Sequence, residues 1–137
     1  LGEYCVLVPS LEMIAENTKN EKAATLAQTL DQAVSKYFEN AKSPSRKVNE
    51  IDNRGSTFYL ALYWAQALAT QNKDTAMQTR FARVAKKLEE NEAKITEEML
   101  AAQGEPADVG GYYVPNTVKA TKEMRPSATF NAIIDGM

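Results

Sequence analysis

The segment that most constrains the fold is Phe58–Ala69, which reads FYLALYWAQALA. Its only polar side chains are Gln66 and those that carry the tyrosine hydroxyls. A helix that is apolar nearly all round must be enclosed by other elements, because no face of it is suited to water. We therefore predict a central, buried helix over about 57–71, with the rest of the chain packed around it.

Apolar residues recur at helical spacing through most of the remaining chain, and no segment shows a convincing strand pattern. Boundary residues mark the helices: Thr18 and Glu21 form a capping-box pattern, while Ser56, Asp74 and Ser127 are suitable N-caps. The predicted fold class is mainly α, with five to six packed helices, one of them buried at the centre, and no substantial sheet. After the opening segment, the predicted helices span about 20–41, 57–71, 75–102, 117–124 and 127–134.

The opening run, LGEYCVLVPSLEMIA, has helical spacing but contains Pro9, which removes a backbone donor and predicts a kink or break near Val8. Cys5 lies on an apolar face, and we interpret it as a buried structural cysteine. A single cysteine forms no internal disulfide and suits a reducing compartment, so we expect a cytoplasmic protein. The run starts at Leu1 without a helix cap, which leads us to expect a piece of a longer protein.

Composition excludes several classes of function. The 137 residues include 16 Lys and Arg against 18 Asp and Glu, whereas a nucleic-acid-binding domain would be basic. No apolar run approaches the length of a membrane span. The chain has no histidine, and so lacks the commonest general base and zinc ligand. The glutamates near the end of the 75–102 helix have no metal-loop spacing and are expected to be solvated: Glu89, Glu90, Glu92, Glu97 and Glu98.

The loop before the central helix, residues 43–56, reads SPSRKVNEIDNRGS and is densely charged. One interpretation, favoured by spacing alone, is a charge-balanced loop whose polar side chains cap backbone donors. The alternative is anion binding, because Arg46 and Arg54 offer planar guanidinium groups that suit phosphate or carboxylate. The capping residues in the first interpretation are Asp52, Asn53 and Ser56.

The segment Gly104–Asn116 contains two prolines and three glycines, and we predict an ordered turn region. Its glycine pair lacks the spacing of a phosphate-binding loop. We expect Tyr112 and Tyr113 to pack over the bundle, with their hydroxyls at its edge. Arg125 is interpreted as a cation at the C-terminal end of a helix, where it meets the last carbonyls.

Several long motifs resemble the C-terminal region of bacterial monomeric NADP-dependent isocitrate dehydrogenases. They are SPSRKVNEIDNRGSTFYLALYWAQALA at 43–69, GGYY at 110–113, MRPSATFN at 124–131 and the opening LGE. The resemblance covers essentially all 137 residues in order. It implies that residues 1–137 are one helical segment that completes a domain of a longer, α/β parent enzyme.

The resemblance implies that the parent oxidises isocitrate to 2-oxoglutarate and CO2, with NADP as hydride acceptor and Mg2+ or Mn2+ as the metal. The catalytic and metal-binding residues of the family lie upstream of Leu1, so we expect none in this chain, and we expect the chain alone to be inactive. Arg46 matches the arginine of the family that contacts the 2′-phosphate of NADP. Arg54 is held as a further candidate for cofactor binding and, with Asp52, as a support of the loop.

This chain departs from the family pattern at three positions. Asn49 stands where glycine is frequent, Thr57 where histidine is frequent, and Pro9 within a helix that is otherwise uninterrupted. A second hypothesis also remains open, in which the chain is an autonomous helical interaction module whose charged loop binds an acidic protein or peptide.

Overall fold

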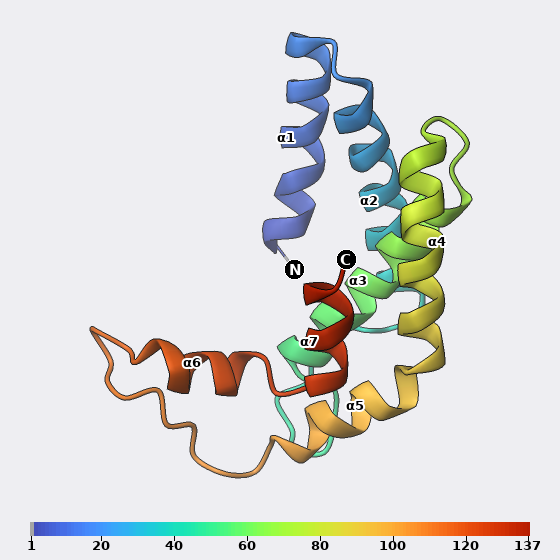
Figure 1. The fold of residues 1–137 in the computed structure, drawn as a ribbon. Coiled ribbons are helices and arrows are strands. Elements are labelled where there is room, and N and C mark those ends of the chain that lie inside the picture. The colour runs from blue at the N-terminus through green and yellow to red at the C-terminus, as the bar shows by residue number, and fades with distance from the viewer. Residues whose placement is uncertain (1) are drawn as a thin grey trace.

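The computed structural model describes residues 2–137. This part of the chain is built from helices and contains no strand, which confirms the mainly α class (Figure 1). The helices are α1 (Gly2–Thr18), α2 (Glu21–Glu39), α3 (Asn53–Thr70), α4 (Thr75–Glu90), α5 (Glu92–Ala101), α6 (Thr117–Met124) and α7 (Ala128–Asp135).

Helix α3 is the centre of the fold, as its apolar sequence predicts. It packs against α2 and α4, and α5 also contacts it. The Trp64 indole N–H donates to the Thr29 hydroxyl of α2 at 3.0 Å. The ring of Phe58 meets that of Phe130 in α7 edge to face, with centroids 5.4 Å apart. The buried residues of α3 are Gly55, Ser56, Phe58, Tyr59, Leu60, Leu62, Tyr63, Ala65 and Leu68.

The helix predicted over 75–102 is two helices, α4 and α5, so the described chain has seven helices where five to six were expected. The chain turns at Asn91, whose side-chain amide donates to the Lys87 carbonyl at 2.8 Å and so replaces a helical partner. The apolar stripe continues across this turn, with Leu88 buried before it and Ile95 after it. Periodicity therefore gave no sign of the break.

Helix α2 is capped by Asn20 and not by the predicted Thr18 capping box. The Asn20 side-chain oxygen accepts the N–H groups of Lys22 and Ala23, both at 3.1 Å. Thr18 instead ends α1, and its hydroxyl donates to the Ile14 carbonyl. Asparagine is at least as good an N-cap as threonine, which explains why the later residue starts the helix.

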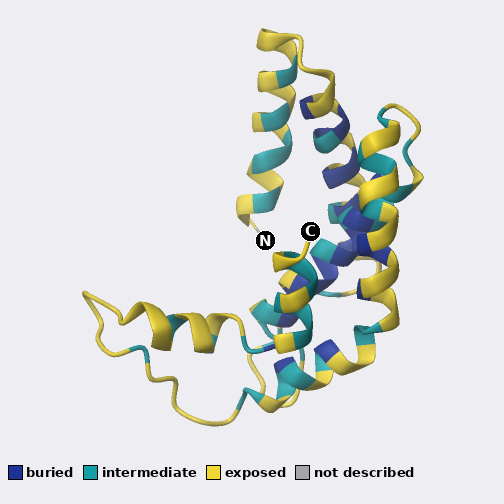
Figure 2. Ribbon diagram, viewed as in Figure 1, coloured by how far each residue is buried: buried dark blue, intermediate teal, exposed yellow. Residues whose placement is uncertain are grey.

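The opening helix is predicted to have a kink or a break near Val8–Pro9. Helix α1 continues through Pro9, so there is no break. The carbonyl that Pro9 leaves without a helical donor belongs to Cys5, which is exposed, and water can take the place of that donor. The prediction of a buried Cys5 is therefore wrong. Helix α1 packs on α2 but buries none of its own residues fully (Figure 2). None of the described helices is long and apolar enough to cross a membrane.

Candidate functional site

The loop between α2 and α3 is closed by hydrogen bonds within its own backbone. The Ser45 N–H donates to the Ile51 carbonyl at 2.7 Å, which brings the two arms of the loop together. The Lys47 N–H donates to the Ser45 hydroxyl oxygen at 3.1 Å. Arg46 lies between these anchored residues, so the backbone that carries it is held on both sides.

Gln103, just beyond α5, fastens this loop from outside. Its side-chain oxygen accepts the Asn49 N–H at 2.8 Å, and its amide donates to the Glu50 carbonyl at 2.9 Å. Asn49 has a φ of 67°, in the left-handed region that glycine adopts freely and that asparagine tolerates better than most residues. The loop conformation thus accounts for both residue types at this position, asparagine here and glycine in the family that the chain resembles.

Asp52 starts helix α3, four residues before the predicted N-cap. One of its carboxylate oxygens accepts the N–H groups of Arg54 at 2.9 Å and Gly55 at 3.1 Å. The predicted cap, Ser56, is already in the first turn of the helix and is buried. Its hydroxyl donates to the Lys42 carbonyl at 2.6 Å and ties the start of the loop to α3.

Arg54 is fully engaged in holding the loop. Its Nε and Nη2 donate to one oxygen of Asp52 at 2.9 and 2.7 Å. Its Nη1 donates to the main-chain carbonyl of Glu123 in α6 at 2.8 Å. Partial burial would raise the pKa of Asp52, but hydrogen bonds from Arg54, Gly55 and Gln103 outweigh burial and lower the pKa below its ordinary value. The positive charge of Arg54 and the negative charge of Asp52 therefore neutralise each other within the loop.

Arg46 differs from Arg54 because its side chain is exposed and makes no hydrogen bond or ion pair with any described residue. The neighbouring Lys47 does have a partner: its Nζ lies 3.9 Å from Oε1 of Glu50, and both side chains are exposed. The site therefore presents one unpaired guanidinium on a backbone fixed from two sides. Such a group binds phosphate or carboxylate through two parallel hydrogen bonds.

A cavity of about 220 Å3 lies under the loop, between α3 and α5. Lys42 and Tyr59 both line this cavity, and the ammonium group of Lys42 lies over the Tyr59 ring, 4.0 Å from the ring centre. The Tyr59 hydroxyl donates to Glu92 at 2.8 Å, and burial together with this carboxylate raises the pKa of Tyr59. Glu92 is therefore not a solvated side chain as expected. The turn at Asn91 brings it inward, and no sequence pattern revealed that turn.

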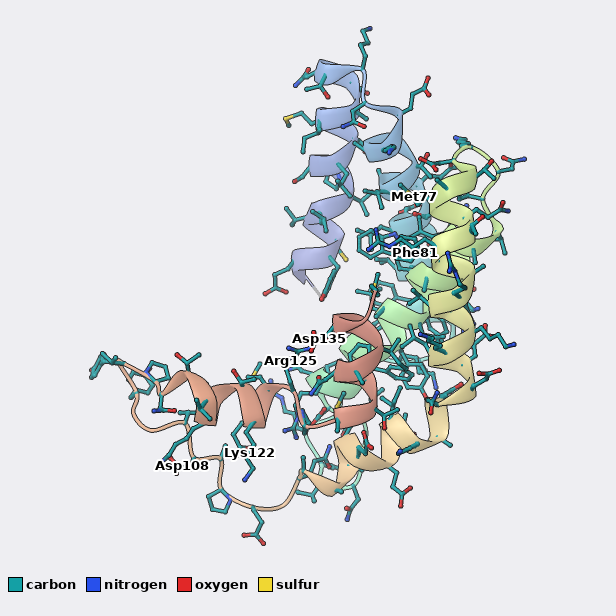
Figure 3. All side chains as sticks on the ribbon, viewed as in Figure 1. Met77, Phe81, Asp108, Lys122, Arg125 and Asp135 are labelled. Atoms are coloured by element: carbon teal, nitrogen blue, oxygen red, sulfur yellow. The ribbon has the colours of Figure 1, made fainter. Side chains whose placement is uncertain are left out.

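Two other expectations outside the loop are resolved. Tyr112 and Tyr113 do not pack over the bundle, since they are 90% and 92% exposed. Arg125 follows α6 as predicted, but its side chain does not meet the last carbonyls of that helix. Its guanidinium donates instead to Asp135 of α7 at 2.8 Å (Figure 3). Within residues 2–137 no group of three or more Cys, Asp or Glu side chains is placed to hold a metal ion.

Comparison with known proteins agrees with the motifs. A family model described as monomeric isocitrate dehydrogenase matches residues 1–135. The chain is 58% identical over 134 residues to isocitrate dehydrogenase (NADP) of Azotobacter vinelandii. It is 53% identical to isocitrate dehydrogenase (NADP) 2 of Colwellia maris and 50% identical to that of Mycobacterium tuberculosis, each over 137 residues.

These matches cover 98% of this chain for the first relative and 100% for the other two, but only 18% of each relative. The chain thus spans less than a fifth of the length of the curated relatives that it matches. The match runs through every element described above, from α1 to α7, and includes the Arg46 loop. The chain therefore belongs to the monomeric isocitrate dehydrogenase family.

Proposed function

We propose that this chain forms one edge of the cofactor site of an NADP-dependent isocitrate dehydrogenase, which converts isocitrate to 2-oxoglutarate and CO2. In this proposal Arg46 binds the 2′-phosphate of NADP. The observation that carries the proposal is the contrast between two arginines of one loop: Arg54 has every nitrogen engaged, whereas Arg46 is exposed and unpaired. The names of the relatives, which include NADP, support the choice of ligand.

The residues of the loop fit a phosphate group. Arg46 supplies a planar pair of donors, and no acidic side chain is paired with it in the described chain. Three other side chains do not touch the phosphate in this proposal but fix the backbone that carries Arg46: Asp52, Arg54 and Gln103. A hydrogen bond from a charged donor contributes about 1.5–3 kcal/mol, which corresponds to roughly ten- to hundred-fold in affinity. One such contact suffices to favour NADP over NAD.

The remaining chemistry belongs to the parts of the enzyme outside this chain. When bound there, Mg2+ or Mn2+ would polarise isocitrate and NADP would accept the hydride. Residues 1–137 would complete a helical part of one domain in the parent, and the isolated chain would have no activity. The single cysteine of the chain is compatible with our placement of the parent in the cytoplasm.

Steady-state kinetics of the full-length enzyme with Arg46→Ala test the proposal. We expect KM for NADP to rise about ten- to hundred-fold, while KM for NAD changes little, because NAD has no phosphate for Arg46 to bind. The matched control is Arg80→Ala, which removes an exposed arginine side chain of α4 that makes no hydrogen bond or ion pair with a described residue. If KM for both cofactors rises equally, or neither changes, the assignment of Arg46 is wrong.

A further inference from the structure

The segment that joins α5 to α7, residues Gly104–Met124, extends away from the bundle (Figure 1). We call it the arm. It comprises a loop and helix α6, and α6 contains no buried residue. Most of the arm is exposed, in contrast to the helices around α3 (Figure 2).

The base of the arm is anchored to the bundle. The Glu123 carbonyl accepts from Arg54 at 2.8 Å, as described above. The Arg125 side chain pairs with Asp135, and its carbonyl accepts from the Asn131 amide at 2.8 Å. These contacts hold the end of α6 next to α3 and α7, so the direction of the arm is set by the fold.

The arm is also ordered internally, although little of it touches the bundle. The Asn116 N–H donates to the Val109 carbonyl at 2.7 Å, and Lys119 pairs with Asp108 at 2.6 Å. Gly110 has a φ of 83°, and a Cβ added there would lie 2.7 Å from the Cβ of Asn116. Only glycine fits this turn, so the shape of the tip is built into the sequence.

The tip of the arm, which we define as residues 109–118, is mostly apolar and carries no charge. Residues 109–118 contain no Lys, Arg, Asp or Glu. The Tyr112 and Tyr113 rings pack edge to face with centroids 5.0 Å apart, yet both side chains are exposed. Val114 is 84% exposed and Val118 79%. Exposed tyrosine and aliphatic side chains on an ordered support are typical of a docking surface.

We infer that the tip of the arm docks into an apolar recess on the remaining part of the same, longer polypeptide. This inference rests on the proposed function, in which the chain is one segment of a parent enzyme. The relatives are more than five times as long as this chain, so most of their polypeptide has no counterpart in this chain. The family is described as monomeric, which disfavours a second copy as the occupant. The absence of charge on the tip disfavours an acidic or basic partner.

Hydroxyl-radical footprinting of the full-length wild-type enzyme tests the inference. The oxidation rates of Tyr112 and Tyr113 are compared with those of the same residues in the urea-unfolded enzyme. We expect several-fold protection in the folded enzyme that does not change on dilution. Rates equal to those of the unfolded chain would overturn the inference. So would protection that disappears on dilution, because it would identify a second copy as the occupant.

A pair of variants provides an independent readout. In the full-length enzyme, Tyr112→Ser with Tyr113→Ser should lower the thermal midpoint by a few degrees, because the docked rings are lost. The control, Tyr112→Phe with Tyr113→Phe, keeps the rings and should retain most of the stability. An unchanged midpoint in the serine variant would overturn the inference, and if that variant fails to fold, the wild-type footprint decides. Neither readout uses NADP, so failure of the Arg46 assignment is distinguishable from failure of this inference.

Discussion

Arg54 and Glu123 are 69 residues apart in sequence, yet the Arg54 guanidinium donates to the Glu123 carbonyl at 2.8 Å. The same guanidinium holds Asp52, the N-cap of α3. One side chain therefore joins the candidate cofactor loop, the start of the central helix and the base of the arm. The Arg54 side chain is only 18% exposed, so its hydrogen bonds are largely shielded from water.

Replacing Arg54 with Ala should destabilise the fold by about 1.5–3 kcal/mol, because Asp52 and the Glu123 carbonyl lose a charged donor. Arg54→Lys should recover only part of this, since an ammonium group cannot bond both partners through a planar fork. Urea unfolding followed by circular dichroism measures the effect. Arg46→Ala is the matched control and should leave stability nearly unchanged. Equal destabilisation by Arg46→Ala and Arg54→Ala would contradict these distinct roles.

Glu98 of α5 holds the start of α7 from the side. Its carboxylate accepts the Ser127 hydroxyl at 2.5 Å, together with the hydroxyl and the N–H of Thr129 at 2.8 and 3.1 Å. Burial alone would raise the pKa of Glu98, but these hydrogen bonds outweigh burial and lower it below its ordinary value of 4.5. The expectation that Glu98 is merely solvated is therefore wrong.

The lowered pKa of Glu98 predicts a pH-dependent contribution to stability. A depressed folded-state pKa stabilises the fold at pH values above 4.5, and this contribution is lost as the pH falls through the lower, folded-state pKa. Urea midpoints measured from neutral pH downward should therefore fall less steeply for Glu98→Gln than for the wild type. Glu97→Gln, which changes an exposed neighbour, should follow the wild type. If Glu98→Gln has the same acid limb as the wild type, the hydrogen bonds do not lower the pKa as inferred.

The elements that sequence predicted well are those that local chemistry determines. The apolar composition of α3 placed it at the centre, and Asp74 and Ser127 cap α4 and α7 as predicted. Errors arose where two residues competed for one role. Asn20 capped α2 in place of Thr18, and Asp52 capped α3 in place of Ser56, because each is an equal or better N-cap.

The candidate site was only partly accessible to sequence reasoning. Arg46 was proposed as a site residue through family motifs, while its exposure and lack of a partner required the structure. Gln103 was missed because it lies 54 residues from Asn49, and nothing local marks a glutamine that fastens a distant loop. Tyr112 and Tyr113 were placed wrongly because aromatic residues are usually buried, and a sequence does not reveal which apolar side chains a bundle leaves uncovered.

Tyr37 is a buried tyrosine whose hydroxyl has no hydrogen-bond partner among the described residues, whereas the Tyr59 hydroxyl bonds Glu92. Because a buried hydroxyl without a partner is unfavourable, Tyr37→Phe should leave stability unchanged or raise it by about 1 kcal/mol. Tyr59→Phe removes the same atom but also a hydrogen bond, and should lower stability by about 1 kcal/mol. Thermal unfolding of the two variants measures the difference, and a larger loss for Tyr37→Phe than for Tyr59→Phe would show that the Tyr37 hydroxyl has a partner.

Asn49 offers a test of whether the backbone of the loop is strained. With φ at 67°, Asn49→Ala should destabilise the loop by about 1 kcal/mol, because alanine keeps the Cβ that is unfavourable in the left-handed region but lacks the short polar side chain that lets asparagine tolerate it. Asn49→Gly should be stable to within about 1 kcal/mol of the wild type, since glycine adopts this conformation without steric cost. Both variants keep the N–H that donates to Gln103, so the comparison isolates the backbone term. Chemical denaturation ranks the three proteins, and an alanine variant as stable as the glycine variant would mean that residue 49 does not occupy the left-handed region in solution.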